Sequence, residues 1–109
     1  MSIAQRKKRV GLNLPVEVRG RGQDGARFTE LTRSVNVSGG GILFESHRAV
    51  AVGDRLMLAI EVPLSLRRHF GDRDVYRARA VVCRVEPGAA HGPRRVGARF
   101  LGAAEATSK

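Results

Sequence analysis

The sequence is poor in cysteine, in aromatic residues and in acidic residues, and each shortage narrows what the protein can be. A single cysteine, Cys83, cannot form a disulfide within the chain, so a disulfide-stapled secreted domain is excluded. Tryptophan is absent and aromatic residues make up only 5% of the chain, which is too few for the base-stacking surface of a single-strand nucleic-acid binder. No apolar run approaches the roughly 20 residues of a transmembrane helix. We therefore expect a cytoplasmic protein with no membrane insertion.

Recognisable catalytic groups are also missing. The three histidines, His47, His69 and His91, lie far apart in loop-like sequence, and none has a second ligand at metal-binding spacing. No nucleophile stands in a pattern with a general base. Cys83 lies among valines, where a free cysteine usually behaves as a small buried hydrophobic residue. The sequence predicts a non-enzymatic protein with no metal and no bound cofactor.

Positive charge is what the chain has in excess. Twenty basic residues against ten acidic ones give a net charge of +10, and 17 of the 20 are arginine. The planar guanidinium group binds phosphates and carboxylates through paired hydrogen bonds. This composition indicates a nucleotide, a nucleic acid or an acidic surface as the partner.

The 109 residues are enough for one domain, and their hydrophobic pattern is that of strands. Leu12, Leu14, Val16 and Val18 alternate with polar residues, and further on Leu31, Val35 and Val37 are expected to share a face with Arg33. The stretch 64–74 has no sustained period and is expected to be a basic loop, with at most one helical turn. Six strands are predicted, at 12–19, 28–37, around 42–44, 54–63, 75–85 and 95–101.

Six short strands without a long helix favour an all-β fold, a six-stranded antiparallel β-barrel, because closure removes exposed sheet edges. The division we expect is a flexible basic N-terminal arm at 1–11, the barrel at 12–102 and a short C-terminal tail at 103–109.

Two clusters stand out as candidate binding elements. The first is the basic run at 5–9, which on its own is better explained as a solvated terminus. The second is the run at 36–41, in which Asn36 and Ser38 fall on one side of a strand. The glycines after them are expected to turn with positive φ and to expose N–H groups to an anion, although a glycine triplet also serves as a plain turn. The candidate residues are Gln5, Arg6, Lys7, Lys8, Arg9, Asn36, Ser38, Gly39, Gly40 and Gly41.

Together these clusters resemble the PilZ domain family, which pairs an N-terminal RxxxR element with a (D/N)xSxxG motif on a six-stranded barrel. Asn36-x-Ser38-x-x-Gly41 matches the second motif in full, and Arg9 matches the second arginine of the first. Gly97-Ala98-Arg99-Phe100 resembles the end of the family's last strand, and Gly53 followed by Asp54-Arg55-Leu56 suits its fourth. One position departs from the family, because Gln5 stands where its first arginine belongs.

The resemblance implies a bacterial receptor for the second messenger cyclic di-GMP, a dianion with two guanines. Arg6 and Arg9 would bind guanine edges and phosphate, with Lys7 or Lys8 as further cations and Gln5 as a hydrogen-bonding side chain. Asn36 and Ser38 would bind the second guanine, and Gly39 to Gly41 would leave room for it. The weaker candidates are Lys7, Lys8, Arg33 and Arg99. Binding would order the arm against the barrel and so produce the signal.

Two other interpretations stay open at this stage. A PilZ-like adaptor without nucleotide binding would act by protein contacts alone, and the glutamine at position 5 favours it. A nucleic-acid-binding barrel would suit the charge but lacks aromatic residues. With no fused output module, the receptor needs an unidentified downstream protein, and both a monomer and a ligand-linked homodimer are compatible with the motifs.

Overall fold

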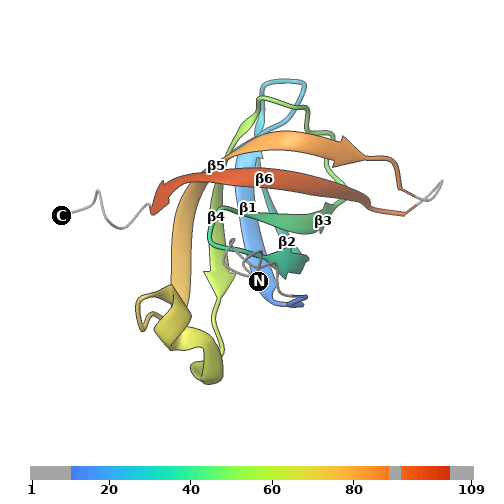
Figure 1. The fold of residues 1–109 in the computed structure, drawn as a ribbon. Coiled ribbons are helices and arrows are strands. Elements are labelled where there is room, and N and C mark those ends of the chain that lie inside the picture. The colour runs from blue at the N-terminus through green and yellow to red at the C-terminus, as the bar shows by residue number, and fades with distance from the viewer. Residues whose placement is uncertain (1–10, 89–91, 104–109) are drawn as a thin grey trace.

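The computed structural model describes residues 11–88 and 92–103, and these form a closed barrel (Figure 1). Its strands are β1 (Pro15–Arg21), β2 (Arg27–Val37), β3 (Gly41–Ser46), β4 (Arg55–Glu61), β5 (Val75–Glu86) and β6 (Arg94–Ala103). They follow one another around the wall in the order β1-β2-β3-β6-β5-β4, and every neighbouring pair is antiparallel. The prediction of a six-stranded antiparallel barrel is confirmed.

The barrel closes because its strands carry inward-facing apolar side chains at every second position. Leu56, Leu58, Ile60 and Val62 are all buried, as their spacing in the sequence predicts. Phe44 is buried almost completely among them. Leu12 and Phe100 lie at the margin of this core and are only partly buried. The interior of the barrel is thus filled by its own side chains rather than by a ligand.

Several strand boundaries differ from the expectation. β1 begins at Pro15 rather than at Leu12, and it continues to Arg21, beyond the predicted end at Arg19. A Cβ at Gly20 would meet the Leu56 Cδ2 atom at 2.8 Å, so a larger residue there would displace the Leu56 side chain. The predicted basic loop contains a 3-10 helix, η2 (Leu64–Phe70). No helix in the described residues is long and apolar enough to cross a membrane.

The predicted face of β2 is wrong. Leu31 is 79% exposed and Arg33 is also exposed, whereas Val37 is buried. Ser34, a polar residue, occupies the inward position and is only 1% exposed. A β-bulge between Ser34 and Asn36 causes this change, because one extra residue reverses which side chains face inward along the rest of the strand.

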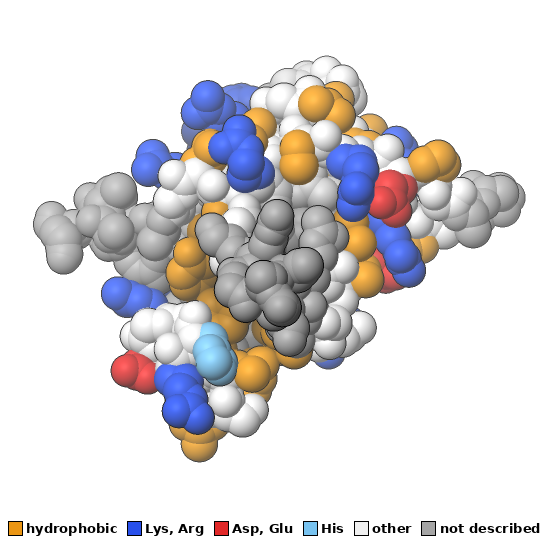
Figure 2. Space-filling model, viewed as in Figure 1, with side chains coloured by type: hydrophobic (Ala, Val, Ile, Leu, Met, Phe, Trp, Pro, Cys, Tyr) orange, Lys and Arg blue, Asp and Glu red, His pale blue; other side chains and the backbone are white. Residues whose placement is uncertain are grey.

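Charged side chains cover the outside of this wall. Figure 2 shows basic side chains scattered over the visible face, with acidic ones at only a few places. Ion pairs join Arg19 to Glu17 and Arg84 to Glu86, and His47 lies 3.9 Å from Glu30, with which it pairs only when its imidazole is protonated.

Candidate ligand-binding site

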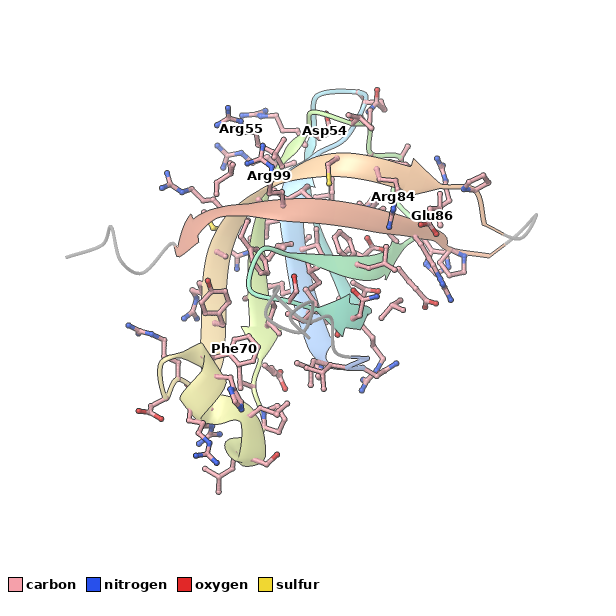
Figure 3. All side chains as sticks on the ribbon, in the orientation of Figure 1. Asp54, Arg55, Phe70, Arg84, Glu86 and Arg99 are labelled. Atoms are coloured by element: carbon pink, nitrogen blue, oxygen red, sulfur yellow. The ribbon has the colours of Figure 1, made fainter. Side chains whose placement is uncertain are left out.

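A shallow hollow of about 370 Å³ lies on the outer wall, where the β2–β3 turn meets β3, β5 and β6. It is within the size range of small-molecule sites. Five residues predicted from the sequence meet in it: Asn36, Ser38, Gly40, Gly41 and Arg99. The other lining residues are Ile42, Leu43, Cys83, Arg84, Gly97 and Ala98. Arg84 extends from β5 and Arg99 from β6 on the same face of the barrel (Figure 3).

The β2 bulge puts Asn36 into this hollow. Ser34 and Val37 both face the core, although they are three residues apart. Regular alternation would give opposite faces to residues at that spacing, so the bulge at Val35 restores Val37 to the core and turns Asn36 outward. Among the described residues the Asn36 amide has no hydrogen-bond partner, so its donors and its acceptor are free for a ligand.

Backbone hydrogen bonds fix the β2–β3 turn. The Ser38 N–H donates to the Gly41 carbonyl at 2.9 Å, and the Gly40 N–H donates to the Ser38 hydroxyl oxygen at 3.2 Å. The Gly40 carbonyl accepts from the Phe100 N–H of β6 at 2.9 Å. The Ser38 hydroxyl therefore accepts one bond within the turn and keeps its own proton for a further acceptor.

The glycines of this turn do not have the positive φ that the sequence predicts. Glycines with positive φ in the described part of the chain are Gly25, Gly53, Gly71 and Gly102, none of which belongs to the triplet. Gly41 is needed for a close approach instead, because a Cβ there would collide with the carbonyl oxygen of Ala98 on β6. Gly39 is exposed and does not line the hollow.

A second bulge, in β5, shapes the opposite side of the hollow. The register shifts between Val82 and Arg84, so that both Cys83 and Arg84 are exposed beside Gly97. The expectation that Cys83 is buried is therefore wrong. Its thiol lies 3.4 Å from the Gly97 carbonyl, to which it donates a weak hydrogen bond. Sequence reasoning missed Arg84 and Gly97 as lining residues; the adjacent valines Val81 and Val82 interrupt the alternation of this strand but do not locate a bulge.

Two cations of the hollow differ in their surroundings. The Arg84 Nε lies 3.2 Å from a carboxylate oxygen of Glu86, and the Arg84 side chain is half exposed. Arg99 is exposed and has no ion pair or hydrogen bond among the described residues. The hollow thus offers one guanidinium without a partner, that of Arg99. The other, that of Arg84, would be shared between Glu86 and a bound anion.

Arg33, the other weaker candidate, lies away from the hollow. Its guanidinium donates to the side-chain and backbone oxygens of Asn13, just before β1. It therefore holds the chain at the beginning of the barrel and is not a lining residue.

The Ser34 hydroxyl fixes the same segment from inside. It accepts a hydrogen bond from the Leu14 N–H at 2.9 Å and donates one to the Leu12 carbonyl at 2.5 Å; we call this the Ser34 clasp. Since β1 and β2 are antiparallel, the described part of the chain begins, at Gly11, near the end of β2 that carries Asn36. Gln5, Arg6, Lys7, Lys8 and Arg9 lie outside the described residues.

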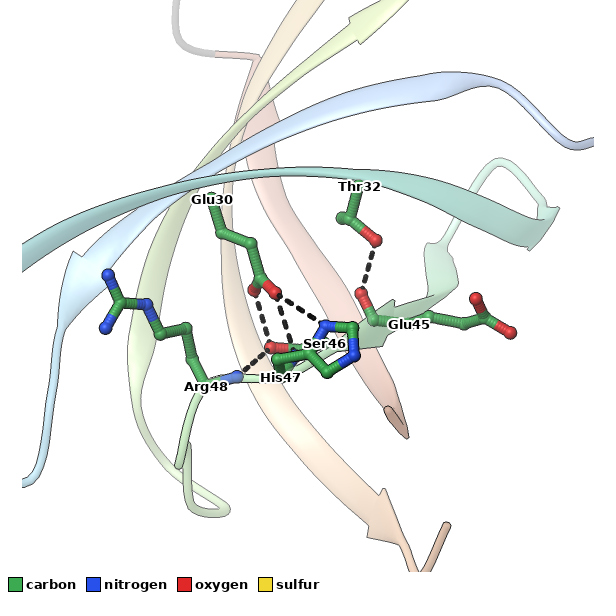
Figure 4. Close-up of polar contacts among 6 residues, drawn as sticks. All are labelled: Glu30, Thr32, Glu45, Ser46, His47 and Arg48. Atoms are coloured by element: carbon green, nitrogen blue, oxygen red, sulfur yellow. Dashed lines mark hydrogen bonds and ion pairs between the residues drawn. The ribbon is translucent and has the colours of Figure 1, made fainter. Parts of the chain in front are cut away.

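Another polar cluster, at the far end of β3, has a structural role (Figure 4). The Glu30 carboxylate accepts hydrogen bonds from the Ser46 hydroxyl at 2.6 Å and from the His47 N–H at 2.8 Å. The Ser46 oxygen in turn accepts from the Arg48 N–H at 2.9 Å. These bonds satisfy the backbone where β3 ends. Within 11–88 and 92–103, no group of three His, Cys, Asp or Glu side chains could hold a metal ion.

The closed barrel, the polar motif at its β2–β3 turn and the cationic hollow beside that turn define a six-stranded β-barrel with a candidate ligand site on its outer wall. Comparison with sequence families names the class more closely: the PilZ domain model matches residues 4–109. The chain therefore belongs to the PilZ domain family, whose members are cyclic di-GMP receptors and adaptors. No curated protein sequence matches the chain.

Solved structures share the fold at low sequence identity. The inhibitor of motility MotI (DgrA) of Bacillus subtilis is similar with a TM-score of 0.65 and 20% identity, over 91% of this chain and 43% of that one. The PilZ domain of YcgR from Escherichia coli, solved with c-di-GMP, gives 0.60 and 17%, over 90% and 78%. The MrkH–c-di-GMP complex of K. pneumonia gives 0.59 and 15%, over 90% and 44%. This chain thus spans less than half of MotI and of MrkH.

Proposed function

We propose that this chain is a cyclic di-GMP receptor that passes its signal to another protein. The observation that carries the proposal is the hollow itself, in which the complete Asn36-x-Ser38-x-x-Gly41 motif meets two arginines from neighbouring strands. Membership of the PilZ family and the c-di-GMP named for the YcgR and MrkH structures support the choice of ligand.

The chemistry of the lining suits both parts of this ligand. The free amide of Asn36 and the unused proton of Ser38 match the acceptors and donors on a guanine edge. Arg99 and Arg84 supply guanidinium groups for a phosphate or for the O6 and N7 atoms of guanine. Gly40 carries no Cβ, so a planar base can lie close to the backbone of the turn.

The N-terminal arm would complete the site from the open side. Arg9 and Arg6, with Lys7 or Lys8, would bind the phosphates and the outer guanine, and Gln5 would contribute a neutral hydrogen-bonding side chain. The Ser34 clasp and Arg33 hold the chain at the point from which this arm departs, beside Asn36. Ligand-induced ordering of the arm would then present a new surface to an as yet unidentified downstream protein.

A PilZ adaptor that binds no nucleotide is the second candidate function. One specific observation favours it, namely the glutamine at position 5 in place of the family's first arginine. Such an adaptor would use the same barrel for protein contacts alone.

Isothermal titration of the purified protein with cyclic di-GMP separates the two. GTP and a mixed-base cyclic dinucleotide test ligand identity, and the stoichiometry distinguishes one bound messenger from a stacked pair. Arg9→Ala and Asn36→Ala are each expected to weaken binding about tenfold or more, which corresponds to about 1.4 kcal/mol. Arg94→Ala is the matched control, because this exposed arginine of β6 does not line the hollow.

Two results would count against the receptor. Equal affinity of the wild type, Arg9→Ala and Asn36→Ala would mean that the ligand binds elsewhere. A ligand at 100 times its Kd should add about 2.7 kcal/mol to the free energy of unfolding. Neither heat of binding nor thermal stabilisation at such an excess would refute the receptor and favour the adaptor that binds no nucleotide.

A further inference from the structure

A second cationic surface lies beside the hollow, on the outer faces of β4, β5 and β6. We call it the arginine face, and it consists of Arg55, Met57, Arg79, Val81, Arg99 and Leu101. The strand register brings these residues together, because Arg55 pairs with Val81 and Val81 pairs with Arg99. Strands lie roughly 4.8 Å apart, so Arg55 and Arg99 are separated by about 10 Å at their Cα atoms.

A parallel row completes the surface. Met57 pairs with Arg79, and Arg79 pairs with Gly102 beyond a register shift; Leu101, two residues after Arg99, lies on the same outer face. A hollow of about 480 Å³ lies between the two rows, lined by Arg55, Met57, Arg79 and Leu101 among others. Met57 and Leu101 are each 39% exposed, so the floor between the arginines is partly apolar.

Nothing within the described chain neutralises these cations. Arg55, Arg79 and Arg99 have no ion pair or hydrogen bond among the described residues, and neither row contains an acidic residue. The nearest acid in sequence, Asp54, accepts the Ala51 N–H at 2.9 Å and forms no ion pair with Arg55. Figure 2 shows basic and hydrophobic side chains together at its upper left, with the acidic ones elsewhere, and Figure 3 locates Arg55 and Arg99 there.

We infer that the arginine face binds an acidic protein segment that also carries apolar side chains. The inference rests on the proposed function, since it assigns a surface and a chemistry to the downstream partner. Carboxylates pair with guanidinium groups through two parallel hydrogen bonds, and apolar side chains between them would cover Met57 and Leu101. A nucleic acid fits less well, because phosphates make no use of the apolar floor and the two rows contain no aromatic residue for base stacking.

Fluorescence anisotropy with a labelled peptide of repeated Glu-Glu-Leu units tests this surface. Two competitors of equal negative charge are oligo-glutamate and a single-stranded oligonucleotide. The mixed peptide is expected to bind about fivefold more tightly than either, because only it buries the apolar floor. Arg55→Ser combined with Arg79→Ser is expected to weaken peptide binding about tenfold.

Arg94→Ser combined with Arg95→Ser is the control, because it removes the same charge from exposed positions at the opposite end of β6. It should change the affinity by no more than about twofold. The single variants Arg55→Gln and Arg79→Gln keep most of the side-chain length and test the same point should the double variant fail to fold. Equal losses in the two double variants, or tighter binding of the oligonucleotide, would overturn the inference.

The same variants keep this inference separable from the proposed function. Arg55 and Arg79 do not line the candidate ligand site, so their replacement should leave cyclic di-GMP binding unchanged. If the wild type binds the peptide but not cyclic di-GMP, only the receptor proposal is refuted. If it binds cyclic di-GMP but not the peptide, only the inference about the arginine face is refuted.

Discussion

Replacement of Ser34 by alanine tests whether the clasp at the beginning of the barrel stabilises the fold. The variant removes the acceptor of the buried Leu14 N–H and the donor to the Leu12 carbonyl. A buried N–H left without a partner costs about 1–3 kcal/mol, whereas the half-buried Leu12 carbonyl can turn to water at little cost. We expect a loss of about 2 kcal/mol in the free energy of unfolding, or about 10 °C in Tm.

Urea denaturation followed by far-ultraviolet circular dichroism measures this loss as a lower midpoint with an unchanged slope. Ser65→Ala is the matched control: it removes the same hydroxyl at an exposed position of η2 and should stay within about 0.5 kcal/mol of the wild type. If both variants unfold at the same urea concentration, the clasp contributes nothing net, and the chain before β1 is held by Arg33 and by packing alone.

Three other measurements follow from the hollow. Gly41→Ala is expected to lower the free energy of unfolding by about 1–3 kcal/mol in urea denaturation, because its Cβ collides with Ala98, and wild-type stability would contradict that contact. Gly97→Ala meets only ordinary contacts, at 3.6 Å from the Arg84 Cβ, so it should keep its stability and yet bind cyclic di-GMP more weakly in titration. Equal affinity of Gly97→Ala and the wild type would mean that the ligand does not lie against Gly97. The exposed Cys83 should react with Ellman's reagent in the native protein, and more slowly with saturating cyclic di-GMP; reaction only after unfolding would contradict its exposure.

The fold could be predicted from the sequence because the barrel depends on a local pattern. In β4 the alternation of Leu56, Leu58 and Ile60 with more exposed residues assigns each side chain to a face without knowledge of any other strand. Similar alternation in β1 and β6 gives these strands one apolar face each. A closed barrel buries all these faces and has no open edge. The strands were therefore located to within a few residues.

The bulges could not be predicted, because a bulge is defined by the partner strand. Whether Val35 is an extra residue depends on its pairing with β3, and the local sequence still alternates through it. The same is true of Cys83, whose exposure follows from the shift of β5 against β6. Asn36 and Ser38 were predicted because two polar side chains fall on one side of a strand just before a glycine run, and the family resemblance then assigned them a ligand, whereas Arg84 carried no motif and was missed.

The hollow lies outside the barrel for a physical reason that also explains the need for a second element. Six strands enclose an interior that Phe44, Leu58, Ile60 and their neighbours fill completely, so a ligand can only bind on the outer wall. Alternation alone would cover that wall with evenly spaced solvated side chains. The two bulges break the alternation and gather Asn36, Cys83 and Arg84 around one depression, which stays open on its solvent side. Under the proposed function a dianion in an open depression needs cations on that open side, since water would otherwise compete for every bond. Under the same proposal, the basic residues at 5–9, which precede the described part of the chain, would supply these cations.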